Sequence, residues 1–174
     1  MERPSDPAVL GNQGKRDFAA GSYATALDKF RRAADGYAAL DDPANQAEQM
    51  NNVGVALLQL RRPREAFDAV TGTDVVFEAQ GDSRRQAIAL NNQAAALEGL
   101  HRSEEAITTY EKAARLLGEA GEAGLQSEAL KAAAAVNLRR GRVASSGSSM
   151  LSALISNPNP NLLERMLKAL LRRI

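Results

Sequence analysis

The chain has 174 residues, a length that suits one domain with a continuous hydrophobic core. It is 44% hydrophobic and 25% charged, which favours folding over disorder. It has no cysteine, which excludes disulfide bonds, thiolate metal sites and a thiol nucleophile. The formal net charge of +1 divides into −5 over residues 1–137 and +6 over residues 138–174. With no apolar signal segment at the start and no apolar run long enough to span a bilayer, we expect a cytoplasmic protein.

The first half of the chain predicts two pairs of helices. Asp6-Pro7 and Asp42-Pro43 each combine a capping side chain with a proline at the first helical position. Within the first pair, Gly21 interrupts the pattern, and a second helix follows from Ser22 to about Leu40. Within the second pair, the turn falls at Arg61-Arg62-Pro63, and one continuous second helix is expected to end at Gly81.

The second half predicts two further pairs and a terminal helix. Ser83 opens the third pair, which turns at His101-Arg102-Ser103. The fourth pair starts near Gln126 and turns at Gly141. Its second helix contains Ala144-Ser145-Ser146-Gly147-Ser148-Ser149, a poor helix former. Apolar spacing of three and four residues and many alanines predict an all-α fold.

Residues of one kind recur at intervals of 40. One column holds small residues of the first helices, and two others hold alanines and bulky residues of the second helices: Gly14, Gly54, Ala94 and Ala134; Ala26, Ala66 and Ala106; Phe30, Val70 and Tyr110. A fixed period of this length is typical of a solenoid, in which each unit buries its apolar face against its neighbours. We therefore expect one domain over 1–174, with repeats at about 7–46, 47–86, 87–126 and 127–156.

These columns resemble the tetratricopeptide repeat (TPR) family. The segments that match its second-helix pattern best are Gly21 to Phe30 and Arg102 to Ala113. The period is longer than the usual repeat of about 34 residues, and so resembles the long-repeat branch that includes kinesin light chain and the Pins/LGN adaptors. The resemblance implies a right-handed α-solenoid of three to four helix-turn-helix repeats, with the first helices lining a concave groove.

No catalytic or metal-binding constellation stands out. His101 is the only histidine and falls in a turn, and a transition-metal site without cysteine or a second histidine would have to rest on carboxylates. We therefore expect neither an enzyme nor a metal or cofactor.

Asparagines recur in the first helices, although asparagine is a mediocre helix former. Asn12, Asn52 and Asn92 share one column, with Asn51 and Asn91 beside two of them. The TPR resemblance implies that this column faces the groove, where an amide can bracket the backbone of an extended peptide. Alternatively, Asn52 and Asn92 hold neighbouring helices together; Asn51 and Asn91 are expected to face a partner.

Basic residues fall on the same predicted face. Lys15, Lys131 and Arg139 lie near the groove, opposed by Glu48 and Glu98. Some TPR domains clamp a terminal carboxylate with lysine and asparagine. Here only Lys131 occupies such a column, which disfavours a full clamp.

The C-terminal segment predicts an amphipathic helix at about 159–173. Its apolar stripe includes Leu163, Met166, Leu167, Leu170 and Leu171. We expect it to cap the solenoid, because the last repeat needs a cover. Docking on a partner or on a second copy is the next interpretation. Binding to a membrane surface is disfavoured because tryptophan and phenylalanine anchors are missing.

The sequence thus predicts a non-catalytic scaffold or adaptor that holds an extended or helical segment of another protein in its groove. The alternative is a structural subunit that forms a homo-oligomer or larger complex through its C-terminal helix and end faces. A nucleic-acid partner is not expected, because no basic stripe is interleaved with aromatic residues.

Overall fold

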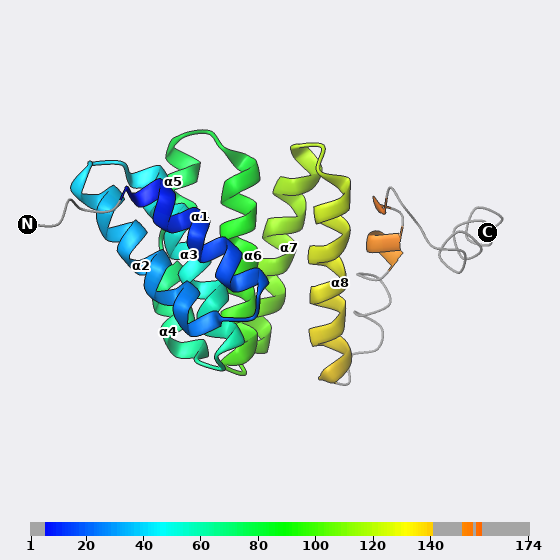
Figure 1. Cartoon of the computed structure of the whole chain (residues 1–174). Helices are drawn as coiled ribbons and strands as arrows, with labels where there is room; N and C mark the ends of the chain where they lie inside the picture. The colour runs from blue at the N-terminus through cyan, green and yellow to red at the C-terminus, as the bar shows by residue number, and fades with distance from the viewer. Residues whose placement is uncertain (1–5, 141–150, 155, 158–174) are drawn as a thin grey trace, which may run out of the picture.

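The computed structural model describes residues 6–140, 151–154 and 156–157 (Figure 1). Within these ranges it has eight helices of seven or more residues and no strand: α1 (Pro7–Ala19), α2 (Tyr23–Ala39), α3 (Pro43–Gln59), α4 (Pro63–Val70), α5 (Thr73–Ala79), α6 (Ser83–Gly99), α7 (Ser103–Glu119) and α8 (Ala123–Arg139). The predicted all-α fold class is confirmed.

The helices form a row of antiparallel hairpins that runs from α1 to α8 (Figure 1). Helices that follow one another in the chain pack together, except for α4 and α5; α5 packs against α3, and α6 also packs against α3 and α4. Contacts between helices therefore stay within a hairpin or between adjacent hairpins, which is the organisation of a solenoid.

Aspartates cap the first helix of three hairpins. Asp6 Oδ1 accepts a hydrogen bond from the Ala8 backbone N–H at 2.8 Å, and Asp42 Oδ1 accepts one from the Asn45 N–H at 3.0 Å, as the sequence predicts. Asp82 caps α6 in the same way, one residue before the predicted start, whereas Ser22 makes no side-chain cap.

The hairpins begin at residues 7, 43, 83 and 123, so the expected boundaries at 47, 87 and 127 fall four residues inside α3, α6 and α8.

A left-handed residue follows a helix every 20 positions. Gly21, Gly81 and Gly121 alternate with Asp41 (φ 54°), Arg61 (φ 58°) and His101 (φ 59°). Each is followed by a residue whose backbone N–H bonds back to the last turn of the helix; the Arg102 N–H, for example, donates to the Leu97 carbonyl at 2.9 Å. The 40-residue period therefore divides into two half-repeats that end in the same turn.

This turn predicts a stabilising substitution. Replacing His101 by glycine should raise the free energy of unfolding by about 1 kcal/mol, because a left-handed conformation costs a residue with a Cβ roughly 1–2 kcal/mol. Gly121→Ala is the matched control: nothing lies within 4 Å of the added Cβ, so it meets only the backbone penalty and should destabilise. Thermal unfolding followed by circular dichroism checks both, and shifts of the same sign would contradict this explanation.

The second helix of the second hairpin is not continuous, and the sequence prediction of one helix ending at Gly81 is wrong on this point. α4 ends at Val70, Thr71 is extended, Gly72 is left-handed (φ 83°), and α5 then begins. Two β-branched residues around a glycine propagate a helix poorly. Thr73 also donates its hydroxyl to the Val70 carbonyl at 2.8 Å, which stabilises the new start. The break places Phe77 against Ala47 of α3 and Ala89 of α6.

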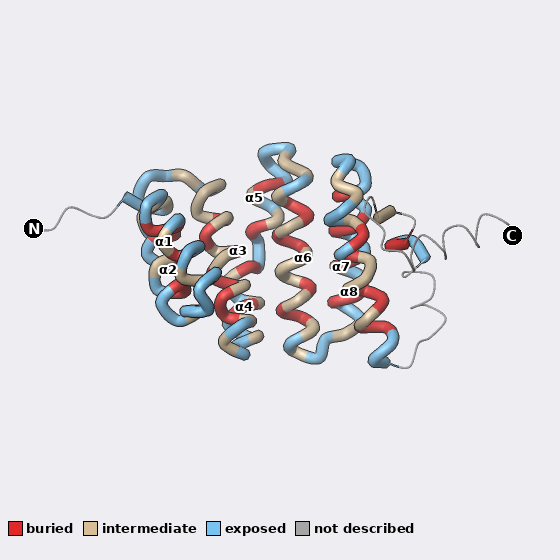
Figure 2. Tube along the Cα trace, turned by 45° about the vertical axis from the view of Figure 1, so that its right-hand side comes forward, coloured by how far each residue is buried: buried red, intermediate tan, exposed pale blue. Residues whose placement is uncertain are grey.

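The predicted columns form the core. Phe30, Val70 and Tyr110 are 2%, 1% and 4% exposed, and the alanines at 26, 66 and 106 are fully buried. Figure 2 shows buried residues along the sides of helices that meet their neighbours and exposed residues at the turns. Small residues in the alanine column let each second helix approach its partner closely.

Residues 151–154 form a short helical turn on the outer side of α8. The Ser127 hydroxyl donates to the Ala153 carbonyl at 2.8 Å, and Ala153 and Leu154 are buried. The predicted turn at Gly141, the serine-rich segment 144–149 and the helix at 159–173 with Leu163, Met166, Leu167, Leu170 and Leu171 lie outside the described residues.

Candidate partner-binding site

A cavity of about 260 Å³ lies between α3, α5 and α6. Its lining combines amides, charged groups and two apolar side chains: Glu48, Asn51, Asn52, Phe77, Arg84, Arg85, Ile88 and Asn92. The 40-residue period brings Asn52 and Asn92 to matching places on α3 and α6. These two helices contact each other directly, and α5, which begins after Gly72, contributes Phe77 to the lining.

Asn51 and Asn92 join the two first helices. Asn92 Nδ2 donates to Asn51 Oδ1 at 3.1 Å, and Asn51 Nδ2 donates to the Ala47 carbonyl at 2.9 Å. Asn51 is only 6% exposed. The expectation that Asn51 faces a partner is therefore corrected: its amide is committed inside the protein, because the neighbouring helix covers this side of α3.

Asn52 and Asn92 offer carbonyl groups to the cavity. Asn52 Nδ2 donates to Gln49 Oε1 at 3.4 Å, and Asn92 Nδ2 is taken by Asn51. Within the described part of the chain, no group donates to the Oδ1 atom of either residue. Backbone N–H groups of a bound segment would donate hydrogen bonds to these two oxygen atoms.

Asn91 corresponds to Asn51 one repeat later, but it lacks a partner like the one that Asn92 provides for Asn51. Its Oδ1 is buried and accepts no hydrogen bond from the described residues. The residue that corresponds to Asn92 in the next repeat is Ala132, which has no donor. The chain of amides therefore ends at α6.

Ala132→Asn should complete this chain and raise the free energy of unfolding by about 1 kcal/mol, the typical net value of a hydrogen bond to a buried group. Urea unfolding of Ala132→Asn in the wild-type and Asn91→Ala backgrounds measures it. The gain should vanish when Asn91 is absent; an equal gain in both backgrounds would rule out the Asn91 hydrogen bond as its cause.

The other predicted residues do not line the cavity. Asn12 is exposed on α1, and Lys15 pairs with Glu48 at 3.0 Å. Lys131 pairs with Glu128 of its own helix at 3.1 Å, and Arg139 pairs with Glu98 of α6. The predicted ladder thus converges on Asn51, Asn52 and Asn92, while Asn12, Lys131 and Arg139 lie elsewhere.

Glu98 also accepts a hydrogen bond from the Tyr110 hydroxyl at 3.4 Å. Burial, reinforced by the negative charge of Glu98, raises the pKa of Tyr110 above its ordinary value. The phenol therefore stays neutral and acts as a donor, so that Glu98 connects α7 and α8 through Tyr110 and Arg139.

The sequence analysis missed Arg84 and Arg85, which form the α6 wall. Arg84 Nε donates to Glu122 Oε1 at 2.6 Å, and Arg85 Nε donates to Asp82 Oδ2 at 2.6 Å, with its guanidinium 4.9 Å from the centre of the Phe77 ring. Hydrogen bonds from the Arg85 backbone and side chain hold the pKa of Asp82 below its ordinary value. Two cations in the first turn of a helix are unfavourable with respect to the helix dipole, and this unusual placement is the sequence feature that could have identified Arg84 and Arg85 as candidates.

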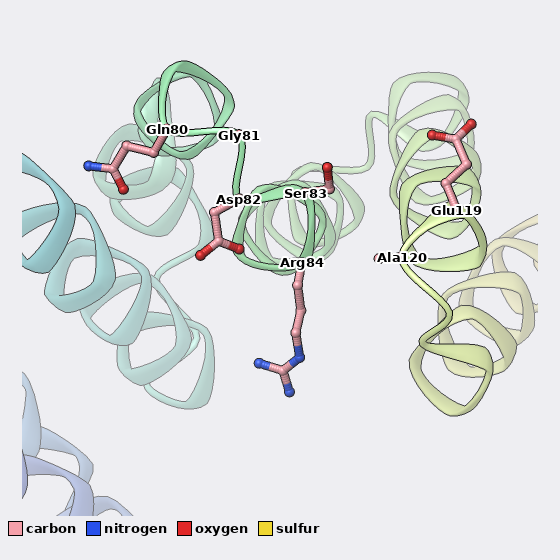
Figure 3. A pocket seen from close by; sticks show the side chains of 7 residues that line it. All are labelled: Gln80, Gly81, Asp82, Ser83, Arg84, Glu119 and Ala120. Carbon is pink, nitrogen blue, oxygen red and sulfur yellow. The ribbon is translucent and has the colours of Figure 1, made fainter.

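A second, shallower cavity of about 500 Å³ adjoins the first at the α5–α6 turn. Figure 3 shows Gln80, Asp82 and Ser83 on one side and Glu119 on the other, with the Arg84 side chain extending away from α6. Arg84 belongs to the lining of both cavities.

Among the described residues, no group of three His, Cys, Asp or Glu side chains is placed to hold a metal ion. His101 is exposed at its turn, as predicted. None of the described helices is long and apolar enough to cross a membrane.

No family model and no curated protein matches this sequence. Solved structures do match its fold. BtubC (BKLC) from P. vanneervenii superposes with a TM-score of 0.78 at 16% identity, over 92% of this chain and 70% of that one. The MamA RS-1 ArsTM double mutant superposes with a TM-score of 0.66 at 18% identity, over 89% of this chain and 76% of that one. With the helical repeats described above, these likenesses establish a TPR-like α-solenoid fold.

Proposed function

We propose that this protein is a non-catalytic scaffold of the long-repeat TPR type that holds an extended or helical segment of another protein across α3 and α6. The observation that carries the proposal is the pair of open carbonyls, Asn52 Oδ1 and Asn92 Oδ1, one repeat apart at one cavity. A side-chain carbonyl that lacks a protein donor is suited to accept a backbone N–H.

The remainder of the lining supports this reading. Ile88, which is half-buried, supplies apolar surface for one side chain, and Asn51 fixes the orientation of Asn92. A site whose polar groups are held in place by the fold loses less entropy when it binds.

A display library of random 16-residue peptides, selected on the full-length protein, tests the proposal. Synthetic versions of the enriched peptides should bind the Asn52→Ala/Asn92→Ala variant at least about fivefold more weakly, since two hydrogen bonds of about 0.5–1.5 kcal/mol each are lost. Fluorescence anisotropy measures the affinities, and circular dichroism confirms the helicity of each variant.

The matched control is Gln59→Ala/Gln93→Ala, which removes two amides from the same helices, α3 and α6, outside this cavity. Its affinities should equal those of the wild type. Failure to enrich any peptide, or equal binding by the asparagine variant, would overturn the proposal.

A further inference from the structure

A groove of about 270 Å³ lies along α3, α4 and α5, and we call it the α3/α5 groove. Residues three and four apart share one face of a helix. The α3 residues of this groove have that spacing, and they lie on the face opposite to Asn52: Pro43, Gln46, Ala47 and Met50. Ala69 of α4 and Val76 of α5 complete the apolar part of the lining, on either side of the break at Gly72.

The break between α4 and α5 leaves Met50 less covered than its counterpart one repeat later. Leu90 occupies the same column, is 3% exposed, and lies in one core cluster with Ala114 of α7. In the second hairpin the residue that corresponds to Ala114 is Asp74, which follows the break, and Met50 is only half-buried. An apolar position of the core is therefore open here to a side chain from outside.

Acids surround this apolar floor. Asp68 lies in the lining, and Asp42 and Asp74 each stand next to a lining residue in the chain. Arg64 pairs with Asp68 at 3.4 Å, and Arg85 acts on Asp42 but is itself paired with an acid of its own helix start. Within the described residues, Asp74 forms no ion pair. The groove thus complements a segment that is both apolar and basic.

The C-terminal segment of the chain has this chemistry. Residues 159–173 carry four basic side chains against Glu164, a net charge of +3: Arg165, Lys168, Arg172 and Arg173. Their predicted apolar stripe contains Leu163, Met166, Leu167, Leu170 and Leu171. A helix that lays such a stripe into an apolar groove is a common mode of recognition between proteins.

The place where the described chain ends favours a second copy as the source of this segment. Residues 151–157 lie beside α8, whereas the groove lies beyond α7 and α6 (Figure 1). The path from α8 to α4 crosses three packed helix pairs of about 8–10 Å each, about 24–30 Å along the row. Leu163 follows Asn157 by six positions, which span at most about 21 Å when fully extended. The stripe of the same chain therefore falls short of the groove.

We propose that residues 159–173 of one copy bind in the α3/α5 groove of a second copy, so that the protein self-associates. Apolar side chains of the segment cover Met50 and Val76, and its basic side chains lie near Asp68 and Asp74. The groove and the cavity with Asn52 are on opposite faces of α3. Self-association therefore leaves the cavity of every copy open, which brings several cavities together and raises the avidity for a partner with repeated segments.

Sedimentation equilibrium of the full-length protein tests the proposal. The wild type should associate reversibly, and Val76→Lys should raise the dissociation constant at least about tenfold, since it removes apolar surface and repels a basic segment. Val75→Lys is the matched control: it adds the same charge to α5, but Val75 is 58% exposed and outside the lining. It should leave self-association nearly unchanged. A monomeric wild type, or equal losses in the two lysine variants, would overturn the proposal.

A disulfide experiment gives a second test, which does not depend on the stability of Val76→Lys. The chain has no cysteine, and Thr71 is an exposed residue of the lining. Differently tagged chains with Thr71→Cys and with Leu167→Cys should form a mixed disulfide on oxidation. Thr25→Cys, at an exposed site of α2 outside the groove, should not pair with Leu167→Cys.

Two results of this experiment contradict the proposal. Equal cross-linking of Leu167→Cys to Thr71→Cys and to Thr25→Cys would mean that the segment has no preference for the groove. In a chain with both Thr71→Cys and Leu167→Cys, a disulfide that forms only within the chain would show that the chain's own segment fills the groove.

Discussion

Replacing Phe30 by alanine should lower the free energy of unfolding by about 3–5 kcal/mol, the range for a large aromatic ring removed from a packed core. Phe30 is 2% exposed and lies in a cluster with Leu27, Val53 and Leu57, which joins α2 to α3. Its Cε1 atom also lies 2.7 Å from the position that a Cβ on Gly14 would take, so the ring fills the space between α1 and α2. The Phe30 side chain thus stabilises the contact of α2 with α1 and its contact with α3.

Urea unfolding followed by circular dichroism measures this loss. Phe18→Ala is the control, since Phe18 is half-buried at the end of α1 and its ring meets Tyr23 at 5.1 Å. Phe18→Ala should lower the free energy of unfolding by clearly less than Phe30→Ala does. Equal losses for the two phenylalanines would show that burial between α1, α2 and α3 does not set the stability of this end of the solenoid.

Gly54→Ala should also destabilise the protein, by about 1–3 kcal/mol. Alanine is the better helix former by about 1 kcal/mol, so a loss here would oppose the intrinsic propensity. The reason is steric: the added Cβ would lie 2.3 Å from Val70 Cγ1, and Val70 is 1% exposed and cannot move away. Thermal and urea unfolding of the variant check the sign.

Gly118→Ala provides the contrast. There the nearest atom to the added Cβ, at 2.4 Å, is Nε2 of Gln126, the far end of a flexible side chain. This variant should be neutral or slightly stabilising. A loss of stability as large as that of Gly54→Ala would contradict the steric explanation.

Val70→Ala should rescue Gly54→Ala. Each single substitution destabilises, one by crowding and the other by leaving a cavity, but in the double variant the Cβ added at residue 54 fills part of the space left by the two carbon atoms removed at residue 70. The double variant should therefore be more stable than the sum of the single losses predicts, by about 1–3 kcal/mol. Additive losses would mean that residues 54 and 70 do not compete for the same space.

Local chemistry explains what the sequence determined by itself. The aspartate caps at 6 and 42, the turns at 21, 61 and 101, and the buried column of Phe30, Val70 and Tyr110 all depend on residues close in sequence or on the helical period. Because the repeats present similar signals, the described helices other than α4 and α5 could be placed without knowledge of their neighbours.

Tertiary packing decided the features on which a binding site depends. Asn51 and Asn52 are adjacent in sequence and equally polar, and both line the cavity, yet only the approach of α6 buries Asn51 and leaves Asn52 half-buried. The break at Gly72 was hidden because the 40-residue columns continue through it, and its consequence, the placement of Phe77, depends on α3 and α6. Arg84 and Arg85 carry no periodic signal, and their contacts with Glu122, just before α8, and with Phe77 of α5 form only when these elements pack beside α6.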